Sequence, residues 1–183
     1  MNPEVLKPSK QPMVILMAED DADDCLLAKE ALAASGLLNE LKIVGDGVEL
    51  IDYLLQNPPY THALRPGLIL LDMNMPRKNG REALAEIKTH AELKRIPVVI
   101  LTTSQADEDI RLGYDLGASS YITKPVSFEG LVTVMQNLGN YWLEIVRLPE
   151  DGPSLDTAPS LETGPSLEIP VTSKAIPKGD DHA

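Results

Sequence analysis

The amino-acid sequence predicts a doubly wound α/β domain, a (βα)5 unit whose five-stranded parallel sheet is covered by helices on both faces. Two observations carry this prediction. Five short, continuous apolar runs recur between residues 13 and 148, and stretches with apolar residues at helical spacing follow each of them. Short apolar runs are typical of strands buried on both faces, and right-handed crossovers through the intervening helices make such strands parallel.

Each predicted strand is followed along the chain by a predicted helix. The apolar runs predict strands at residues 13–18, 41–44, 68–71, 98–101 and 119–122. The stretches between them carry apolar residues three and four positions apart, which is the spacing of one helix face. In the first four helices these residues are Leu27, Ala31, Leu32; Val48, Ile51, Leu54, Leu55; Ala83, Leu84, Ile87; and Ile110, Leu112, Leu116. In the last helix they are Phe128, Leu131, Met135, Leu138, Trp142 and Ile145.

The 183 residues are long enough for one domain with flanking segments. We predict an N-terminal extension at 1–12, the domain at 13–148 and a tail at 149–183. The tail has seven acidic residues against two lysines, and it repeats a Pro-Ser-Leu-acidic pattern that begins at Pro153, Pro159 and Pro165. Such a segment has too little apolar surface to offset the entropy lost on ordering. We predict a disordered acidic tail, and the alternative is an interaction motif.

Composition excludes several classes of protein. The net charge of -12 would repel a duplex phosphate backbone, so we expect no binding to nucleic acid. No apolar run reaches the roughly 18 residues of a membrane span, and the first 12 residues contain prolines where a signal peptide would be apolar. Cys25 is the only cysteine, which excludes an intramolecular disulfide and suits a reducing compartment. We expect a cytoplasmic protein in which Cys25 packs on a helix.

Polar side chains stand where the predicted strands end, and ligands of doubly wound sheets bind at that edge. The first strand ends in Glu19-Asp20-Asp21 and the third in Asp72-Met73-Asn74. The fourth ends in Thr102-Thr103-Ser104 and the fifth in Thr123-Lys124-Pro125. Carboxylate oxygens are the ligands of hard cations, and Mg²⁺ binds one or two of them while keeping waters for a phosphoryl group. The pattern therefore predicts a Mg²⁺ site.

Each of these signals has an ordinary structural explanation when it is taken singly. The acidic triplet suits the cap and first turn of the following helix, where negative charge is favourable. Asp72 could be a loop carboxylate, Thr102 a β-branched strand residue and Lys124 a solvated amine. Their joint placement at one end of one sheet favours a functional site.

With these residues in place, the chain resembles the receiver domain of two-component response regulators, which has a flavodoxin-like fold, over residues 13–148. The matching features are the acidic pair, the segment Asp72-Met-Asn-Met-Pro-Arg-Lys-Asn-Gly80, the threonine after the fourth strand and the Lys-Pro after the fifth. The stretches 68–81 and 141–149 look most like single-domain regulators that partner phytochrome-type histidine kinases. In this family the first acidic residue is more commonly aspartate, and here it is Glu19.

The resemblance implies a role for each matching residue. Asp72 is the implied phospho-acceptor, and the implied metal ligands are Asp20 directly, Glu19 through water, Asp72, and the backbone carbonyl of Asn74. Lys124 is the implied cation that neutralises the transferred phosphoryl group, as such charge-rich transition states require. Thr102 and Tyr121 match the switch pair, and Thr103, Ser104 and Asn74 line the approach of water. Asp21 matches only a helix cap.

Three other functions compete with this interpretation. A dehalogenase-like phosphatase also uses an aspartate nucleophile with Mg²⁺, but its nucleophile belongs to an Asp-x-Asp motif after the first strand. A flavin-binding module would need a phosphate-cradling loop after the first strand, where this chain is acidic. A receiver used only as a phosphorylation-independent scaffold is the third alternative.

The expected output is contact with another protein. No predicted domain follows residue 148, so we expect a signalling protein that catalyses only its own phosphotransfer and dephosphorylation. The last helix carries apolar residues outside its core-facing stripe, and exposed patches of this kind mark partner sites. These residues are Val132, Val134, Tyr141, Leu143 and Val146. We predict a homodimer through the face of the fourth helix, fifth strand and fifth helix, and the alternative is that Leu143 and Val146 fold back on the domain or cap the core near Pro149.

Overall fold

The computed structural model describes residues 13–145. The predicted extension at 1–12, the tail at 149–183 and Val146 lie outside the described residues. Within them, no helix is both long and apolar enough to cross a membrane.

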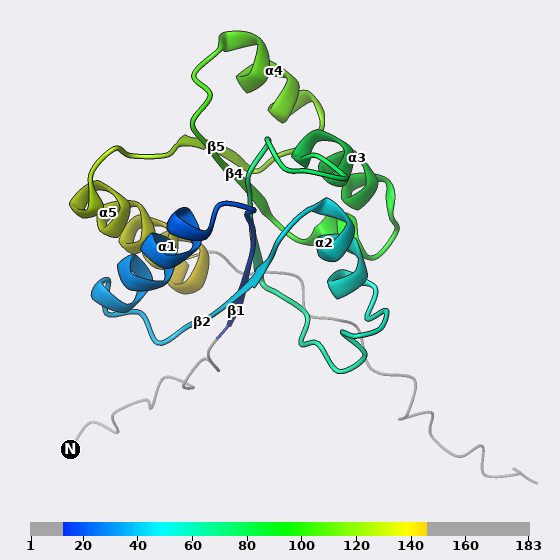
Figure 1. Cartoon of the computed structure of the whole chain (residues 1–183), viewed down its shortest axis with the longest axis horizontal. Helices are drawn as coiled ribbons and strands as arrows, with labels where there is room; N and C mark the ends of the chain where they lie inside the picture. Colours follow the sequence, from blue (N-terminus) through cyan, green and yellow to red (C-terminus); the bar gives the residue numbers. More distant parts are fainter. Residues whose placement is uncertain (1–12, 146–183) are drawn as a thin grey trace, which may run out of the picture. The chain divides into compact units, whose positions relative to one another are not determined.

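The described residues form one five-stranded sheet in which every strand pair is parallel. The strands are β1 (Val14–Ala18), β2 (Glu40–Val44), β3 (Leu68–Leu71), β4 (Val98–Thr102) and β5 (Ser120–Thr123), and their order in the sheet is β2-β1-β3-β4-β5 (Figure 1). From β1 the chain first adds a strand on one side and then continues on the other. The order therefore reverses between β1 and β3, which is where doubly wound sheets bind ligands.

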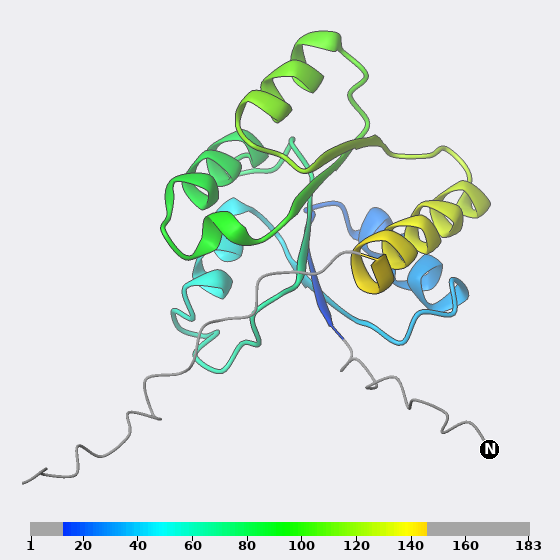
Figure 2. The ribbon, with the colours of Figure 1, turned by 180° about the vertical axis from the view of Figure 1, so that it is seen from behind.

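Helices cover both faces of this sheet. They are α1 (Ala22–Ala34), α2 (Gly47–Leu54), α3 (Gly80–Thr89), α4 (Asp107–Asp115) and α5 (Phe128–Leu138), with a 3-10 turn η1 (Leu93–Arg95) and a π-helical extension η2 (Gly139–Ile145). Helices α1 and α5 lie side by side on one face, and α2 and α3 lie on the other (Figures 1 and 2). The predicted (βα)5 order is confirmed.

Two separate cores explain the continuous apolar runs. Along β4, Val98 and Ile100 belong to the core under α2 and α3, while Val99 and Leu101 belong to the core under α1 and α5. Strands β1 and β3 alternate in the same way, because successive side chains of a strand point to opposite faces. The prediction of strands buried on both faces is therefore confirmed for the three central strands.

The same prediction is wrong for the two outer strands. Only Val44 of β2 is buried, and all four residues of β5 are partly exposed. Both strands lie at the sheet edges, where one side has no neighbouring strand. An apolar run therefore located each strand correctly but did not reveal its position in the sheet.

Some apolar residues at helical spacing are exposed instead of facing the core. On α1, Leu27 is 40% exposed, and the buried positions are Ala28, Ala31 and Leu32. Leu55 follows the end of α2 and Phe128 begins α5, so neither is covered by a neighbouring element, and both are exposed. Conversely, Val132 and Val134, predicted to be free surface, pack partly against the core under α1 and α5.

Candidate functional site

Four strand ends bring the predicted site residues to one edge of the sheet. Glu19 directly follows β1, Asp72 follows β3, Thr102 ends β4 and Lys124 follows β5. Backbone hydrogen bonds continue the ladder one step past the strands, from Glu19 to Val44 (3.0 Å), from Asp72 to Ala18 (3.0 Å) and from Lys124 to Thr102 (2.8 Å). The sheet itself therefore fixes the backbone of the site.

Three carboxylates meet at this edge. Each of Glu19, Asp20 and Asp72 offers an oxygen within 4.8 Å of the oxygens of the other two. Glu19 and Asp72 are buried, whereas Asp20 is exposed. A compact set of carboxylate oxygens with one side open to solvent suits a divalent cation that keeps part of its water shell.

The ammonium of Lys124 lies among carboxylates. Its Nζ is 2.6 Å from Glu19 Oε2, 2.6 Å from Asp24 Oδ2 and 3.7 Å from Asp72 Oδ1. Burial alone would lower the pKa of Lys124, but the hydrogen bonds to Asp24 and Glu19 outweigh this effect and raise its pKa above the ordinary value. Lys124 is therefore a permanent positive charge beside Asp72.

Burial raises the pKa of Glu19 above its ordinary value, and the hydrogen bond to Lys124 offsets part of that rise. Glu19, Asp24 and Asp72 pair with the single ammonium of Lys124, and Asp20 lies beside Glu19 and Asp72, so carboxylates outnumber cations among the described residues of the cluster. Such an excess of negative charge over the available cation fits binding of a divalent metal ion.

Asp24 is the site residue that the sequence analysis missed. It lies in the first turn of α1, four positions after Asp20, and a helix begun at Asp21 carries it back toward the strand ends. Asp21 accepts hydrogen bonds from the backbone of Asp23 (2.9 Å) and Asp24 (3.0 Å), which confirms that it caps the helix. Asp20 precedes α1, so no helical spacing links it to Asp24, and in the sequence Asp24 stands only as another acidic residue of the first helical turn.

Cys25 follows Asp24 and packs on α1 as expected. Its side chain is half-buried, and its Sγ donates to the carbonyl oxygen of Glu19 at 3.6 Å. Burial raises the pKa of the thiol. Cys25 is therefore a protonated packing residue behind the acidic pair.

The loop after Asp72 is held against the site by close backbone contacts. The Asn74 N–H donates to Asp72 Oδ2 at 3.1 Å, and the Gly80 N–H donates to the Met73 carbonyl at 3.1 Å. A Cβ on Gly80 would lie 2.2 Å from the carbonyl oxygen of Asp72, so only glycine fits there. Arg77 adopts a φ of 59° and pairs with Asp46 and Glu49, which ties this loop to α2.

Thr102 and Tyr121 occupy distinct environments. Thr102 is 0% exposed, and its Oγ1 has no hydrogen-bond partner among the described residues. An unpaired buried hydroxyl costs free energy, so this Oγ1 is available to donate to a group that binds at the strand ends. Tyr121 lies within β5, and its hydroxyl donates to the Ser104 carbonyl at 3.1 Å. Its hydroxyl therefore contacts the β4–α4 loop.

The model of the response regulator receiver domain matches residues 15–136. The chain belongs to the response regulator receiver family. The response regulator Rcp1 of Synechocystis sp. is 45% identical over 141 residues, which cover 77% of this chain and 96% of that protein.

Two solved structures share this level of identity. The phosphorylated cyanobacterial phytochrome response regulator RcpA is 45% identical with a TM-score of 0.71, and the match covers 75% of this chain and 99% of that one. The Mn²⁺-bound form of Rcp1 is also 45% identical, with a TM-score of 0.69 and the same coverage. This receiver is thus a response regulator, and its acidic cluster is a candidate site for a divalent metal ion such as the Mn²⁺ that Rcp1 binds.

The site geometry of this receiver also bears on the rival functions. The candidate nucleophile Asp72 follows β3, and the residue two positions on is the amide Asn74, unlike the Asp-x-Asp after a first strand that a dehalogenase-like phosphatase requires. After β1 the chain places Glu19 and Asp20 where a flavin phosphate would lie in a flavodoxin-like fold. The site therefore disfavours both rivals.

Proposed function

We propose that this response regulator accepts a phosphoryl group on Asp72 from a sensor histidine kinase in a Mg²⁺-dependent reaction. One observation carries the proposal: the buried carboxylate of Asp72 lies beside both the Lys124 ammonium, 3.7 Å away, and the carboxylates of Glu19 and Asp20. A nucleophile, a cation and a metal-ligand set are the parts that phosphoryl transfer to a carboxylate needs.

In the proposed reaction, an oxygen of Asp72 attacks the phosphorus of a phosphohistidine. An O–P bond forms, the P–N bond breaks, and its electron pair returns to the imidazole nitrogen of the donor. Lys124 neutralises charge on the equatorial oxygens, and we assign the unpaired Thr102 hydroxyl to donate to one of them in the product. A bound Mg²⁺ would supply the positive charge that lets an anionic donor approach this acidic site.

The metal would be held by Asp20 directly, by Glu19 through water, by Asp72 and by the backbone carbonyl of Asn74. Beyond accepting the phosphoryl group, this regulator would catalyse only its removal, with Thr103, Ser104 and Asn74 beside the path of water. Tyr121, whose hydroxyl is hydrogen-bonded to the Ser104 carbonyl, would move with Thr102 on phosphorylation. Its movement would transmit the change to the α4-β5-α5 face.

We infer that the donor is a phytochrome-type histidine kinase in the cytoplasm. The likeness to Rcp1 and RcpA over most of their length supports this donor, because RcpA is a phytochrome response regulator. A chain with Cys25 as its only cysteine supports the compartment.

The function is tested by intact-mass spectrometry of the full chain with Mg²⁺ and either acetyl phosphate or an autophosphorylated phytochrome-type kinase. We expect a gain of one phosphoryl group from both donors. A phosphorylation-independent scaffold would gain none, and a dehalogenase-like phosphatase would instead turn over phosphate esters repeatedly.

Asp20→Ala is expected to weaken Mg²⁺ binding more than Glu19→Ala. Glu19 already pairs with Lys124 and would reach the metal through water, so its loss should cost roughly tenfold in affinity, as outer ligands typically do. Loss of the direct ligand Asp20 should exceed about a hundredfold. Calorimetric titration measures both constants, because the only tryptophan, Trp142, lies away from the site on η2.

The control for this titration is Asp23→Ala, which removes the same charge from the first turn of α1, three residues after Asp20. It should change the affinity by much less than either ligand variant. Equal losses for Asp20→Ala and Glu19→Ala would contradict the proposed division between direct and water-mediated ligands.

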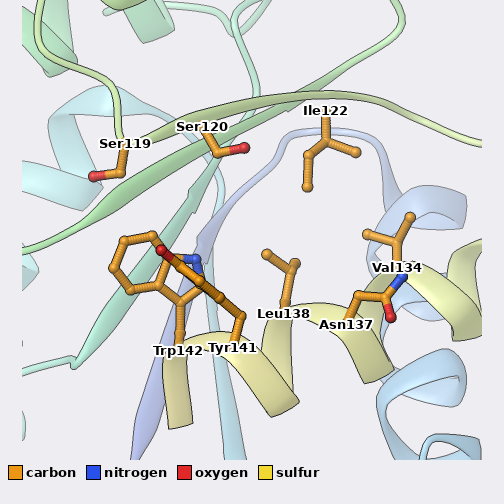
Figure 3. A pocket seen from close by; sticks show the side chains of 8 residues that line it. All are labelled: Ser119, Ser120, Ile122, Val134, Asn137, Leu138, Tyr141 and Trp142. Carbon is orange, nitrogen blue, oxygen red and sulfur yellow. The ribbon is translucent and has the colours of Figure 1, made fainter. Parts of the chain in front are cut away.

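We also propose that a second copy of the chain binds the α4-β5-α5 face. A groove of about 390 Å³ lies between β5 and the end of the last helix (Figure 3). It is lined by Ser119, Ser120, Ile122, Val134, Asn137, Leu138, Tyr141 and Trp142. Tyr141 is 53% exposed and packs edge-on against Trp142, and β5 has no strand on its outer side among the described residues, so a self-complementary contact has both apolar and backbone groups to use.

Tyr141→Ala is expected to shift the protein from dimer toward monomer at tens of micromolar, because it removes the largest exposed side chain of the groove. Sedimentation velocity with and without phosphodonor measures the shift, and phosphorylation should strengthen the wild-type dimer. Leu64→Ala, an exposed apolar residue in the segment before β3, is the control. A wild-type monomer in both states would exclude the dimer.

A further inference from the structure

Asp24 and Glu19 occupy two of the three hydrogen-bond donors of Lys124. Both contacts are 2.6 Å long, while the distance from Nζ to Asp72 Oδ1 is 3.7 Å, beyond hydrogen-bond range. The ammonium therefore binds the carboxylates of β1 and α1 more closely than the carboxylate beside which phosphoryl transfer would occur.

We infer that Asp24 is a positioning residue that restrains Lys124 and thereby slows phosphoryl acceptance at Asp72. This inference rests on the proposed function. A bound divalent metal would attract the Glu19 carboxylate and weaken its hydrogen bond to Lys124. Asp24 is outside the proposed ligand set, so its hydrogen bond to Lys124 would persist. When the donor arrives, the ammonium would therefore still be shared between Asp24 and the phosphoryl oxygens.

The helix cap fixes Asp24 in the position from which it restrains Lys124. Asp21 accepts the backbone N–H of Asp24 at 3.0 Å, so the residue that begins α1 also sets the position of Asp24. The Lys124 side chain is nearly buried and that of Asp24 is only about one-third exposed. Solvent therefore screens this ion pair less than one on the open surface. The pair is strong enough to influence the position of the Lys124 ammonium.

Two effects of Asp24 act in the same direction. Its carboxylate competes with the transferred phosphoryl oxygens for Lys124, and its negative charge repels an anionic donor. Only the first effect requires contact with Lys124. Asp23 separates the two, because it carries the same charge one residue earlier on the same turn and is exposed, while the ion pairs of Lys124 are with Glu19, Asp24 and Asp72.

The test compares rates of phosphorylation by acetyl phosphate at saturating Mg²⁺, measured by intact mass on the full chain. Asp24→Asn keeps the shape of the side chain and should raise the rate about fivefold, the scale of a partly exposed ion pair. It should also lengthen the lifetime of the phosphorylated form, because Lys124 then bonds the phosphoryl group without competition. Asp24→Glu restores a carboxylate and should return both values toward wild type.

Asp23→Asn should change both values by much less than Asp24→Asn. Equal acceleration by the two variants would overturn the inference and leave only a general effect of charge. An unchanged rate in Asp24→Asn, with wild type phosphorylated normally and both proteins folded by thermal melting, would also overturn it. Absence of any mass gain in wild type would instead reject the proposed function, and the inference with it.

Discussion

Asp72→Asn is expected to abolish the mass gain of one phosphoryl group, whether the donor is acetyl phosphate or a histidine kinase. The amide is a very poor nucleophile. Among the described carboxylates at the strand ends, Asp72 alone is buried near Lys124 without being held in a close ion pair. Glu19 and Asp24 each lie 2.6 Å from Nζ, so their oxygens are engaged. Intact mass and peptide mapping measure the loss.

The variant should fold without difficulty. Asp72 adds negative charge to a cluster in which carboxylates outnumber the cation, so its neutralisation should leave the thermal midpoint in metal-free buffer unchanged or raised. Asp23→Asn is the matched control and should retain phosphorylation. If Asp72→Asn gained the phosphoryl group with the modified peptide at an unchanged position, the acceptor assignment would be wrong.

Lys124→Met is expected to lower the free energy of unfolding by about 3 kcal/mol in metal-free buffer, the scale for removing one partner of a buried ion pair. The Glu19 side chain is 1% exposed and would lose its counter-ion. Asp72 would lose its only nearby cation among the described residues. Methionine keeps most of the volume of lysine, so the effect reports on charge. Urea denaturation followed by circular dichroism measures it.

Mg²⁺ distinguishes this electrostatic effect from a packing defect. A more negative cluster should bind the ion more tightly, so added Mg²⁺ should raise the thermal midpoint of Lys124→Met by more than that of wild type. Lys29→Met, at an exposed position of α1, is the control and should behave as wild type in both measurements. A packing defect would leave the Mg²⁺ increment equal in all three proteins.

Local pattern was sufficient for the elements and for most of the site. The five apolar runs located β1 to β5 within a residue or two, since a strand buried against helices needs an unbroken apolar segment. The rule that parallel strands end at one sheet edge then placed Glu19, Asp72, Thr102 and Lys124 together, although Glu19 and Lys124 are 105 positions apart. Neither step required knowledge of side-chain packing.

The predicted helix stripes are largely confirmed, since Ala31 and Leu32 of α1 and all three predicted residues of α3 are buried, but the exposure of Leu27 and the location of the sheet edges lay beyond this reasoning. Leu27 fits the predicted apolar stripe on α1, yet its neighbour Ala28, which the stripe did not include, is buried and Leu27 is 40% exposed. The apolar runs of β2 and β5 did not reveal two edge strands. An edge is defined by which strand has no neighbour, and that depends on the whole sheet.

The sequence by itself determined the (βα)5 order and most of the residues that gather at the strand ends, because the hydrophobic period of each segment and the direction of parallel strands follow from local pattern, and the strand-end motifs carried the resemblance to receivers. Only the tertiary structure decided what those residues touch. The contact of Asp24 with Lys124 and the hydrogen bond from Tyr121 to the Ser104 carbonyl each join separate elements, and the lack of a partner for the buried Thr102 hydroxyl among the described residues depends on what packs around β4. Such contacts depend on helix rotation and loop path to within about an ångström, the tolerance of a hydrogen bond, and residue spacing along a chain does not encode that precision.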